Sequence, residues 1–282
     1  MVAPVKEYPV VWLQGSTCTG CSISVLNSTS PTIKNLLVDE VVPGKHLSLR
    51  YHATIMAGAG EVAWKALQSE IGKGGYLLVV EGAIPAAAGG VYGHLGEKSI
   101  LAVVEEAARA AAAVIALGTC ASFGGIPAAA PNPSGCIGME ELLDRQGLKV
   151  PLVNVPGCPP HPDWFVGTVA ALLLGDLQLP PLDDLKRPLA FYGSLIHENC
   201  PRRAYFDEGK FAKQPGEPGC LYYVGCKGPV TYSDCPKRLW NGGTNWCIGT
   251  GAPCQGCTQP EFPDLVAPFY QKTTDADLPA IA

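Results

Sequence analysis

Charged residues are scarce in this sequence. Asp, Glu, Lys and Arg make up 16% of the 282 residues, against about 25% in typical soluble domains, while apolar residues make up 47%. A chain with so little charge either has a large interior or covers part of its surface with a partner. The glycine, proline and cysteine content argues against an unusually large core, so we expect a protein partner. The net charge of −5 gives no electrostatic reason to bind nucleic acid or an anionic membrane.

Long hydrophobic segments are also missing. The first residues, MVAPVKEYPVV, lack the apolar segment of roughly 7–15 residues that a secretory signal contains. The most apolar helical stretch, Phe165 to Leu174, is far too short to span a bilayer. We therefore expect a soluble chain without a transmembrane segment.

Short motifs of nucleotide-binding and hydrolytic enzymes are missing as well. There is no Gly-x-Gly-x-x-Gly after a strand, no Walker loop and no Gly-x-Ser-x-Gly elbow. We therefore assign no catalytic residue to this chain. Glu81 follows a predicted strand, and the sequence leaves open whether it relays protons, orients a loop or caps a helix.

Residues from about 8 to 178 alternate between predicted strands and predicted helices. The predicted strands are Val10–Gln14, His46–Tyr51, Tyr76–Val80, Val114–Leu117 and Leu152–Val155. The predicted helices start near Ser22 and at Ser30-Pro31-Thr32, with proline at the first helical position, or span Gly60–Gln68, Ser99–Ala113 and Pro162–Leu174. This alternation predicts an α/β fold with a parallel sheet covered by helices.

The character of the sequence changes beyond Leu185. Seven of the twelve cysteines lie between Cys200 and Cys257, amid glycine, proline, asparagine and aromatic residues. Such a segment buries little apolar area, so we expect inorganic clusters to form its core. We therefore divide the chain into two domains, residues 1–180 and 181–282.

The cysteines carry most of the information about function. Eleven of them, with one histidine, sort into three sets of four donors. The first set is Cys18, Cys21, Cys120 and Cys158. The second set is His197, Cys200, Cys220 and Cys226. The third set is Cys235, Cys247, Cys254 and Cys257. Four soft or borderline donors are what an iron–sulfur cluster or a tetrahedral metal ion requires.

The first set follows the predicted strands. Cys18 and Cys21 come after the first of them, Cys120 after Val114–Leu117, and Cys158 after Leu152–Val155. All four thiols should therefore meet at the carboxyl edge of one sheet, where open α/β folds bind ligands. The Cys-x-x-Cys of this set is similar to a thioredoxin-like redox motif, but such a dithiol has no need of Cys120 and Cys158.

The other sets differ in their donors. In the second set, the imidazole of His197 would leave a cluster less negative than four thiolates would, which raises its potential. In the third set, four thiolates favour a complete 4Fe–4S cluster over a three-iron one. The twelfth cysteine, Cys136, fits no set; it is either a packed thiol or a replacement for Cys120 or Cys158. We treat the remaining histidines as structural: His46, His52, His94 and His161.

Spacing alone leaves three interpretations of the cysteines open. A disulfide framework usually stabilises domains much smaller than this one. Structural zinc suits one four-donor set, but zinc has no redox chemistry and three zinc sites need another rationale. Iron–sulfur ligation accounts for the number, the grouping and the single histidine together.

Seven motifs together resemble the small subunit of nickel–iron hydrogenases. They are CTGC at 18–21, VEG at 80–82, GTCASFGG at 118–125, NVPGCPPHPDW at 154–164, HENC at 197–200, GCKGP at 225–229 and CQGC at 254–257. The resemblance covers about residues 9 to 270. The motifs around Cys18 and Cys158 are shared with the quinone-reductase subunit of respiratory complex I, which lacks the motifs from HENC onward.

The resemblance implies a flavodoxin-like domain that carries a proximal 4Fe–4S cluster on the first set. It further implies a distal cluster on the second set and a medial cluster on Cys235, Cys254 and Cys257. Many family members have proline in place of Cys247 and a medial cluster of three irons, so Cys247 implies a medial 4Fe–4S cluster. Ile23 lies at a position where glutamate is common in the family, and this departure is shared by the nickel–iron–selenium group.

The implied function is electron transfer within a heterodimer that interconverts H2 with protons and electrons. The large subunit would hold the Ni–Fe centre and bury an apolar interface of more than roughly 2,000 Å² against this chain. A multihaem cytochrome would dock near the distal cluster, close to Lys227, Arg202 and Arg203. The family's export as a folded heterodimer implies a periplasmic location, and a cytoplasmic one remains open. Two other functions remain: an iron–sulfur subunit of a quinone- or flavin-linked complex, and a zinc-stabilised interaction module.

Overall fold

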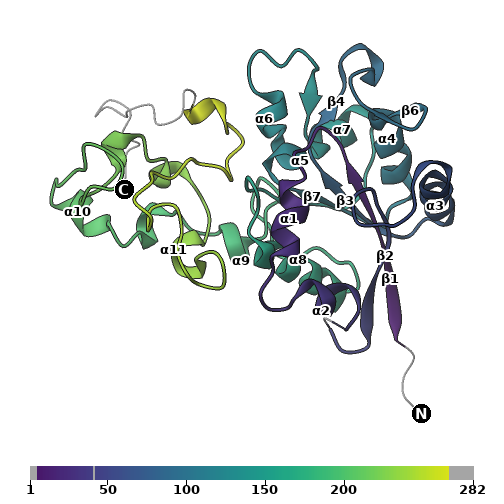
Figure 1. Cartoon of the computed structure of the whole chain (residues 1–282), viewed down its shortest axis with the longest axis horizontal. Coiled ribbons are helices and arrows are strands. Elements are labelled where there is room, and N and C mark those ends of the chain that lie inside the picture. Colours follow the sequence, from purple (N-terminus) through teal and green to yellow (C-terminus); the bar gives the residue numbers. More distant parts are fainter. Residues whose placement is uncertain (1–4, 41, 267–282) are drawn as a thin grey trace. The chain divides into compact units, whose positions relative to one another are not determined.

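A five-stranded parallel sheet is the centre of the first part of the chain (Figure 1). The computed structural model describes residues 5–40 and 42–266. In the order β2-β1-β3-β7-β9, the strands are Lys45–His52, Lys6–Gln14, Leu77–Glu81, Ala113–Leu117 and Leu152–Val155. This is the strand order of flavodoxin-like sheets. The predicted α/β class is confirmed, and every residue of β3 and β7 is buried, as expected for central strands covered on both faces.

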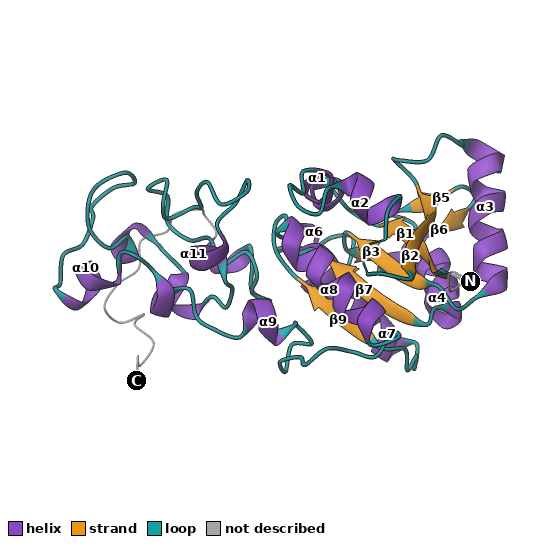
Figure 2. Cartoon of the chain, turned by 90° about the horizontal axis from the view of Figure 1, so that it is seen from below, coloured by secondary structure: helices purple, strands orange, loops and turns teal. Residues whose placement is uncertain are grey.

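Helices cover both faces of this sheet (Figure 2). Val11 and Leu13 of β1 pack against one group of helices, α3 (Gly60–Lys73), α4 (Ile100–Ala110) and α7 (Met139–Arg145). Val10 and Trp12, which point to the opposite face because strand residues alternate, lie beside a second group, α1 (Gly20–Leu26), α2 (Ile33–Leu37) and α8 (Pro162–Leu174). Two short helices, α5 (Thr119–Phe123) and α6 (Gly125–Ala128), follow the carboxyl end of β7.

The predicted strands are confirmed to within a few residues, but several helix boundaries were wrong. Helix α4 ends at Ala110, not at Ala113, because Ala113 already belongs to the buried strand β7. Tertiary packing here overrides the helix propensity of alanine. Helix α3 continues beyond Gln68 to Lys73 and ends at Gly74, which has a φ of 66°.

Some elements were not predicted at all. Helix α7 is one of them. Two short antiparallel pairs were not predicted either: β4 (Ile84–Pro85) with β8 (Cys136–Ile137), and β5 (His94–Leu95) with β6 (Lys98–Ser99). Each of these strands has only two residues, too few for a periodic pattern.

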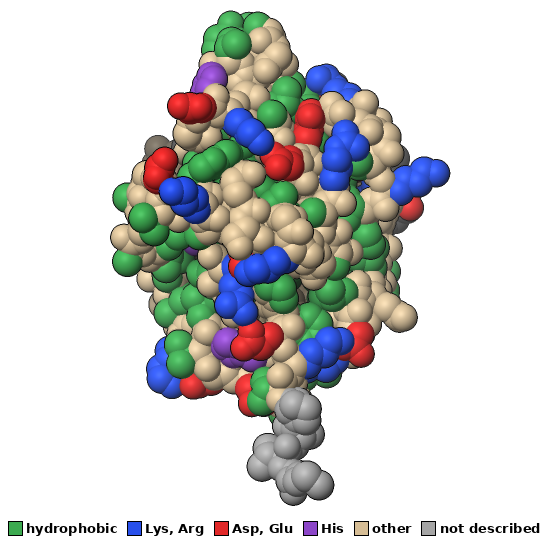
Figure 3. Space-filling view, turned by 90° about the vertical axis from the view of Figure 1, so that its right-hand side faces the viewer, with side chains coloured by type: hydrophobic (Ala, Val, Ile, Leu, Met, Phe, Trp, Pro, Cys, Tyr) green, Lys and Arg blue, Asp and Glu red, His purple; other side chains and the backbone are tan. Residues whose placement is uncertain are grey.

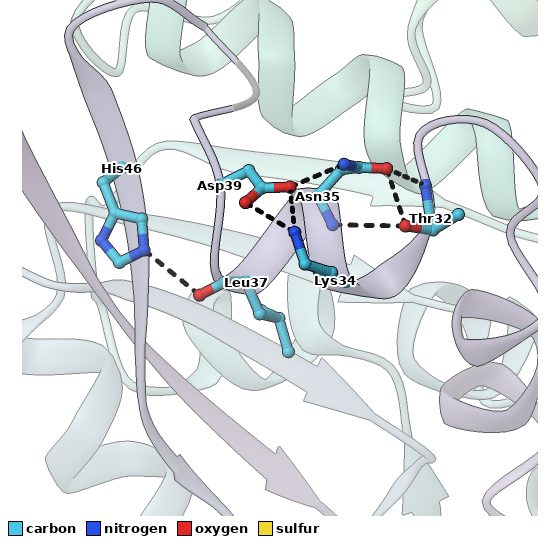
Figure 4. A network of polar contacts seen from close by, with 6 residues as sticks. All are labelled: Thr32, Lys34, Asn35, Leu37, Asp39 and His46. Atoms are coloured by element: carbon cyan, nitrogen blue, oxygen red, sulfur yellow. Dashed lines mark hydrogen bonds and ion pairs between the residues drawn. The ribbon is translucent and has the colours of Figure 1, made fainter.

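The start of α2 corrects another prediction. Pro31 lies outside the helix, and Thr32 is the residue that caps it. The Thr32 hydroxyl accepts a hydrogen bond from the Asn35 N–H, while the Asn35 side chain accepts one from the Thr32 N–H, which forms a capping box (Figure 4). Asn35 also donates to Asp39 at 2.7 Å. The short helix is thus closed at its beginning by its own side chains.

The other end of α2 is tied to the sheet. The Nε2 atom of His46, on β2, lies 3.1 Å from the carbonyl oxygen of Leu37 (Figure 4). Lys34 forms an ion pair with Asp39 at 2.9 Å just after the helix. His46 therefore has a structural hydrogen bond, in line with its assignment as a structural residue.

Basic and acidic side chains lie interspersed on the face of the molecule shown in Figure 3. Ion pairs such as Lys65–Glu61 on α3 and Lys98–Glu106 bring opposite charges within 3.0 and 2.8 Å of each other. In the described part of the chain, no helix combines the length and the hydrophobicity needed to cross a bilayer.

The second compact unit of the chain begins at Leu189. Its described residues, 189–266, form short helical turns, isolated bridges and loops: α9 (Leu189–Tyr192), α10 (Arg203–Asp207), α11 (Cys235–Arg238) and four 3-10 turns, 197–199, 222–224, 228–230 and 264–266. Its hydrophobic cluster includes two buried cysteines, Cys226 and Cys254, with Cys200 and Cys235 packed against it. Thiols thus contribute a substantial part of this small core.

Candidate metal centres

The first cysteine set lies at the carboxyl edge of the sheet. Cys18 is in the loop between β1 and α1, Cys21 is the second residue of α1, Cys120 is in α5 directly after β7, and Cys158 follows β9. The strand order reverses between β1 and β3, so this edge contains the switch point at which such sheets bind ligands. The structure therefore places the four thiols where the strand pattern predicted them.

These four thiols lie close enough to affect one another electrostatically. Burial raises the pKa of Cys120 to about 12, with a further contribution from Cys158. Burial also raises the pKa of Cys21, and the charges of Glu81, Cys120, Cys158 and Cys18 raise it further. Removing a proton from the Cys21 or Cys120 thiol creates a charge that needs a counter-charge, which a cationic metal centre supplies.

Glycines leave the space around the thiols free of side chains. A Cβ atom on Gly118 would lie 2.5 Å from the Cys21 sulfur, and one on Gly125 would lie 2.9 Å from the Cys120 sulfur. Both glycines have positive φ, +89° and +50°. The backbone thus approaches the sulfurs closely, as a site for an inorganic group requires.

Glu81 is the anchor of the loop that carries Cys18 and Cys21. Its carboxylate, at 0% exposure, is at the end of β3. One oxygen accepts hydrogen bonds from the backbone N–H of Cys21 and Ser22 at 3.1 and 3.2 Å. The carboxylate also accepts hydrogen bonds from four side chains: Trp12, Gln14, Thr17 and Ser22. Helix α1 has no side-chain cap of its own, so Glu81 takes that role from a neighbouring strand.

His52 extends this polar network. Its Nε2 lies 3.1 Å from the Ser22 hydroxyl, and its Nδ1 accepts a hydrogen bond from the Thr54 N–H at 3.2 Å. Burial lowers the pKa of His52, although the charge of Glu81 opposes that effect, so the neutral imidazole is favoured. No sequence pattern indicates this contact, because His52 and Ser22 are thirty residues apart.

The second set lines one pocket in the second unit. His197, Cys200, Cys220 and Cys226 all face it, together with Arg202. Burial raises the pKa of all three thiols, that of Cys226 to about 11. The Nε2 atom of His197 is buried and has no hydrogen-bond partner among the described residues. A buried imidazole nitrogen without a partner is costly unless a ligand binds there.

Two groups donate hydrogen bonds to sulfurs of this set. The Arg202 N–H points at the Cys200 sulfur at 3.4 Å, and the Arg202 guanidinium donates to the carbonyls of Glu217 and Gly219, both at 2.9 Å. The guanidinium therefore holds the loop that precedes Cys220 next to Cys200. The Cys254 N–H points at the Cys226 sulfur at 3.3 Å.

The thiols of the third set affect one another electrostatically. Burial raises the pKa of Cys235 to about 11, and the charge of Cys247 contributes to that rise. Burial likewise raises the pKa of Cys254, with contributions from Cys226, Cys257 and Cys235. Cys247 therefore lies close enough to Cys235, and Cys254 close enough to Cys257 and Cys226, to interact electrostatically.

The geometry argues against two of the three interpretations of the cysteines. No disulfide joins any of the twelve cysteines, all of which lie within the described residues, so the disulfide framework is wrong. In the same part of the chain, no three His, Cys, Asp or Glu side chains are grouped so that they could hold a metal ion. A structural zinc needs four donors around one ion, whereas a multi-iron cluster spreads its ligands apart.

Two protein families match the two parts of the chain. Residues 192–270 match the C-terminal family of NiFe/NiFeSe hydrogenase small subunits, and residues 18–172 match the family of the NADH ubiquinone oxidoreductase 20 Kd subunit. The periplasmic [NiFeSe] hydrogenase small subunit of Desulfomicrobium baculatum is 44% identical, with 96% of this chain and 89% of the relative covered. The chain belongs to the nickel–iron hydrogenase small-subunit family.

Further relatives and solved structures agree. The periplasmic [NiFe] hydrogenase small subunit 1 of Nitratidesulfovibrio vulgaris is 42% identical, with 93% of this chain and 81% of the relative covered. The reduced, active form of the Ni-Fe-Se hydrogenase from Desulfomicrobium baculatum matches with a TM-score of 0.87 and 44% identity, covering 95% of this chain and 100% of that one. The family resemblance read from the motifs is confirmed.

Cys136 is the one cysteine of this small subunit outside the three sets. It is 3% exposed, on β8, and its sulfur lies 3.3 Å from the Ser134 hydroxyl and 3.7 Å from the Ser16 hydroxyl. Its charge contributes to the raised pKa of Cys120, which places it at the border of the first set. The two serines satisfy this thiol, as expected of a packed cysteine.

Proposed function

We propose that this chain carries electrons between the Ni–Fe centre of a hydrogenase large subunit and an external redox partner. Three 4Fe–4S clusters would supply the one-electron redox steps. The single observation that supports this most is the gathering of the second set, three thiols and an unpartnered buried imidazole, around one pocket. A multi-iron cluster, which spreads its ligands apart, would use all four donors at once.

We assign the clusters residue by residue. The proximal cluster would bind Cys18, Cys21, Cys120 and Cys158 in the sheet domain. The distal cluster would bind His197, Cys200, Cys220 and Cys226, and the medial cluster would bind Cys235, Cys247, Cys254 and Cys257, both in the carboxyl-terminal domain. The protein tunes these centres through burial and through N–H groups that point at sulfur, such as those of Arg202 and Cys254.

The Cys254 N–H also connects ligands of two of the proposed clusters. Cys254 belongs to the medial set, and the sulfur that its N–H approaches belongs to the distal set. In the same segment, the Lys227 N–H donates to the Cys254 carbonyl at 2.9 Å. The ligands of the two clusters are therefore directly hydrogen-bonded, which provides a short covalent and hydrogen-bonded route for electrons between them.

We infer that apolar side chains near the first set are covered by the large subunit. Ile23 and Leu26 on α1 and Ile126 on α6 are 53%, 45% and 51% exposed. These two helices carry or adjoin the proposed proximal ligands, so a partner that covers them would also shield that cluster from water. The proposal also includes docking of a cytochrome near the distal cluster. It further includes a periplasmic location, because the names of two relatives of this chain give that location.

Metal and sulfide analysis of the purified complex tests the proposal. A heterodimer with nickel, about thirteen irons (twelve in clusters and one at the Ni–Fe centre), about twelve acid-labile sulfides and H2-dependent dye reduction supports it. A co-purified partner without nickel would favour a quinone- or flavin-linked complex. A colourless chain with bound zinc would establish an interaction module in place of an electron carrier.

A further inference from the structure

The imidazole of His197 is held by packing against another ring. Its plane meets the Phe206 ring almost perpendicularly, at 83°, with 4.7 Å between the ring centres. Metal-bound histidines usually fix their orientation by donating the second ring N–H to a carboxylate, a carbonyl or water. Among the described residues no hydrogen bond reaches either ring nitrogen of His197, so the nitrogen that does not bind the iron lacks such a partner. The edge-to-face contact with Phe206 is therefore the main restraint on rotation of the imidazole about its side-chain bonds.

The nearest carboxylates are engaged elsewhere. Glu198, next to His197 in the chain, accepts a hydrogen bond from the Leu195 N–H at 3.3 Å. Asp207 accepts one from the Arg203 guanidinium at 2.8 Å. Neither carboxylate is hydrogen-bonded to the His197 ring, so an aromatic contact replaces the usual polar one.

Phe206 is itself fixed from several sides. It lies in α10 and forms further edge-to-face contacts with Phe211 at 5.8 Å and with Tyr222 at 6.0 Å. The Arg203 guanidinium lies 5.8 Å from the centre of its ring. A ring held by two other aromatics and a cation cannot easily turn, so it can transmit its position to His197.

We propose that Phe206 is a positioning residue for the distal centre: it sets the angle at which the His197 imidazole meets its iron. This inference rests on the proposed function, because it requires a cluster bound by His197. A fixed angle gives one overlap between the nitrogen lone pair and the iron, and hence one potential. A ring that rotates freely would sample several angles, and both the overlap and the potential would then cover a range of values.

The test compares three variants of the complete heterodimer. Phe206→Leu removes the ring, Phe206→Tyr keeps it, and Phe211→Leu makes the same change one ring farther from His197. The readouts are the nitrogen hyperfine coupling of the reduced distal cluster, measured by pulsed EPR, and its midpoint potential. We expect Phe206→Leu to shift or spread the coupling and to shift the potential. Phe206→Tyr should retain the wild-type values, and Phe211→Leu, which removes only one of the contacts of Phe206, should change them less than Phe206→Leu.

Each outcome decides one question. Wild-type coupling and potential in Phe206→Leu overturn the role of Phe206, and so does an equal change in Phe211→Leu. If Phe206→Leu assembles no distal cluster, Phe206→Met, which keeps the volume without the ring, takes its place, and wild-type coupling there overturns the proposal. Absence of nitrogen coupling from the wild-type cluster refutes ligation by His197, and with it the proposed distal site.

Discussion

In the proposed assignment, Cys247 is the residue that decides the composition of the medial cluster. It is an exposed cysteine close to the partly buried Cys235, and its charge contributes to the raised pKa of that thiol. A fourth thiolate completes the coordination of a four-iron cluster, whereas three thiolates leave one corner without a protein ligand. Under that assignment, the identity of this one side chain would determine whether the medial cluster contains four irons or three.

Replacing Cys247 with proline should convert the medial cluster into a three-iron form. The variant heterodimer should show a three-iron EPR signal in stoichiometric amount after oxidation, and the wild type should lack it. Cys136→Ser is the matched control, because Cys136 is a packed thiol held by two serines and should not affect the signal. A strong three-iron signal in the wild type would refute ligation by Cys247.

Glu81 matters at the same scale. Its two oxygens accept from six donors, and the contacts with Trp12, with the Cys21 N–H and with both donors of Ser22 are buried. In Glu81→Gln, an amide NH2 group replaces one of the two acceptor oxygens, and this NH2 cannot accept the hydrogen bonds of the donors that it faces. Since each oxygen serves two buried donors, and each buried donor without a partner costs about 1–3 kcal/mol, we expect a loss of about 2–6 kcal/mol.

The measurement for Glu81→Gln is the melting temperature of the heterodimer together with its iron content. Both should fall, because the loop that holds Cys18 and Cys21 loses its anchor. Glu61→Gln is the control: Glu61 is on the surface of α3, where an ion pair contributes little. Equal melting temperatures and iron contents in the two variants would show that Glu81 does not organise this loop.

At the scale of elements, the β7–α5 connection shows why a glycine is needed at a turn. Gly118 has a φ of +89°, and a Cβ there would lie 2.5 Å from the Cys21 sulfur. We expect Gly118→Ala to lose the proximal cluster, which is about a third of the bound iron if three four-iron clusters are present. Iron and sulfide analysis of the purified heterodimer measures this.

Gly147→Ala tests whether the effect of Gly118→Ala comes from the collision with the Cys21 sulfur or from backbone strain. Gly147 also has a positive φ, +62°, but a Cβ there meets nothing within 4 Å. The Gly147→Ala variant should lose only the stability that backbone strain costs, about 1–2 kcal/mol, and should retain all its iron. Equal iron losses in the two variants would mean that strain, not contact with Cys21, explains the effect of Gly118→Ala.

The elements also show which parts of the fold the sequence could predict. The strands were predictable because runs such as Val114–Leu117 are apolar, β-branched and buried on both faces. Their carboxyl ends placed the first cysteine set correctly at one sheet edge. The start of α2 was not predictable from its proline, because Thr32 and Asn35 form a capping box that the proline obscures. The roles of Glu81 and Phe206 depend on contacts across the fold that no local pattern encodes.

At the scale of the whole molecule, the two units owe their stability to different sources. The first has a sheet whose strands β3 and β7 are completely buried between helices. The described residues of the second contain only short helical turns and isolated bridges, and its hydrophobic cluster includes Cys226 and Cys254. A core that consists partly of thiols depends on whatever binds them.

Removal of the clusters should therefore unfold the two units unequally. After iron is stripped by chelation under reducing conditions, backbone amides within 189–266 should exchange with solvent rapidly. Amides of β1, β3 and β7 should remain protected, because their hydrogen bonds lie in a sheet with its own apolar core. Hydrogen exchange followed by mass spectrometry, on heterodimer with and without iron, resolves the two regions. If residues 189–266 stay as protected as the sheet after iron is removed, side-chain packing alone maintains that unit, and inorganic clusters are not its core.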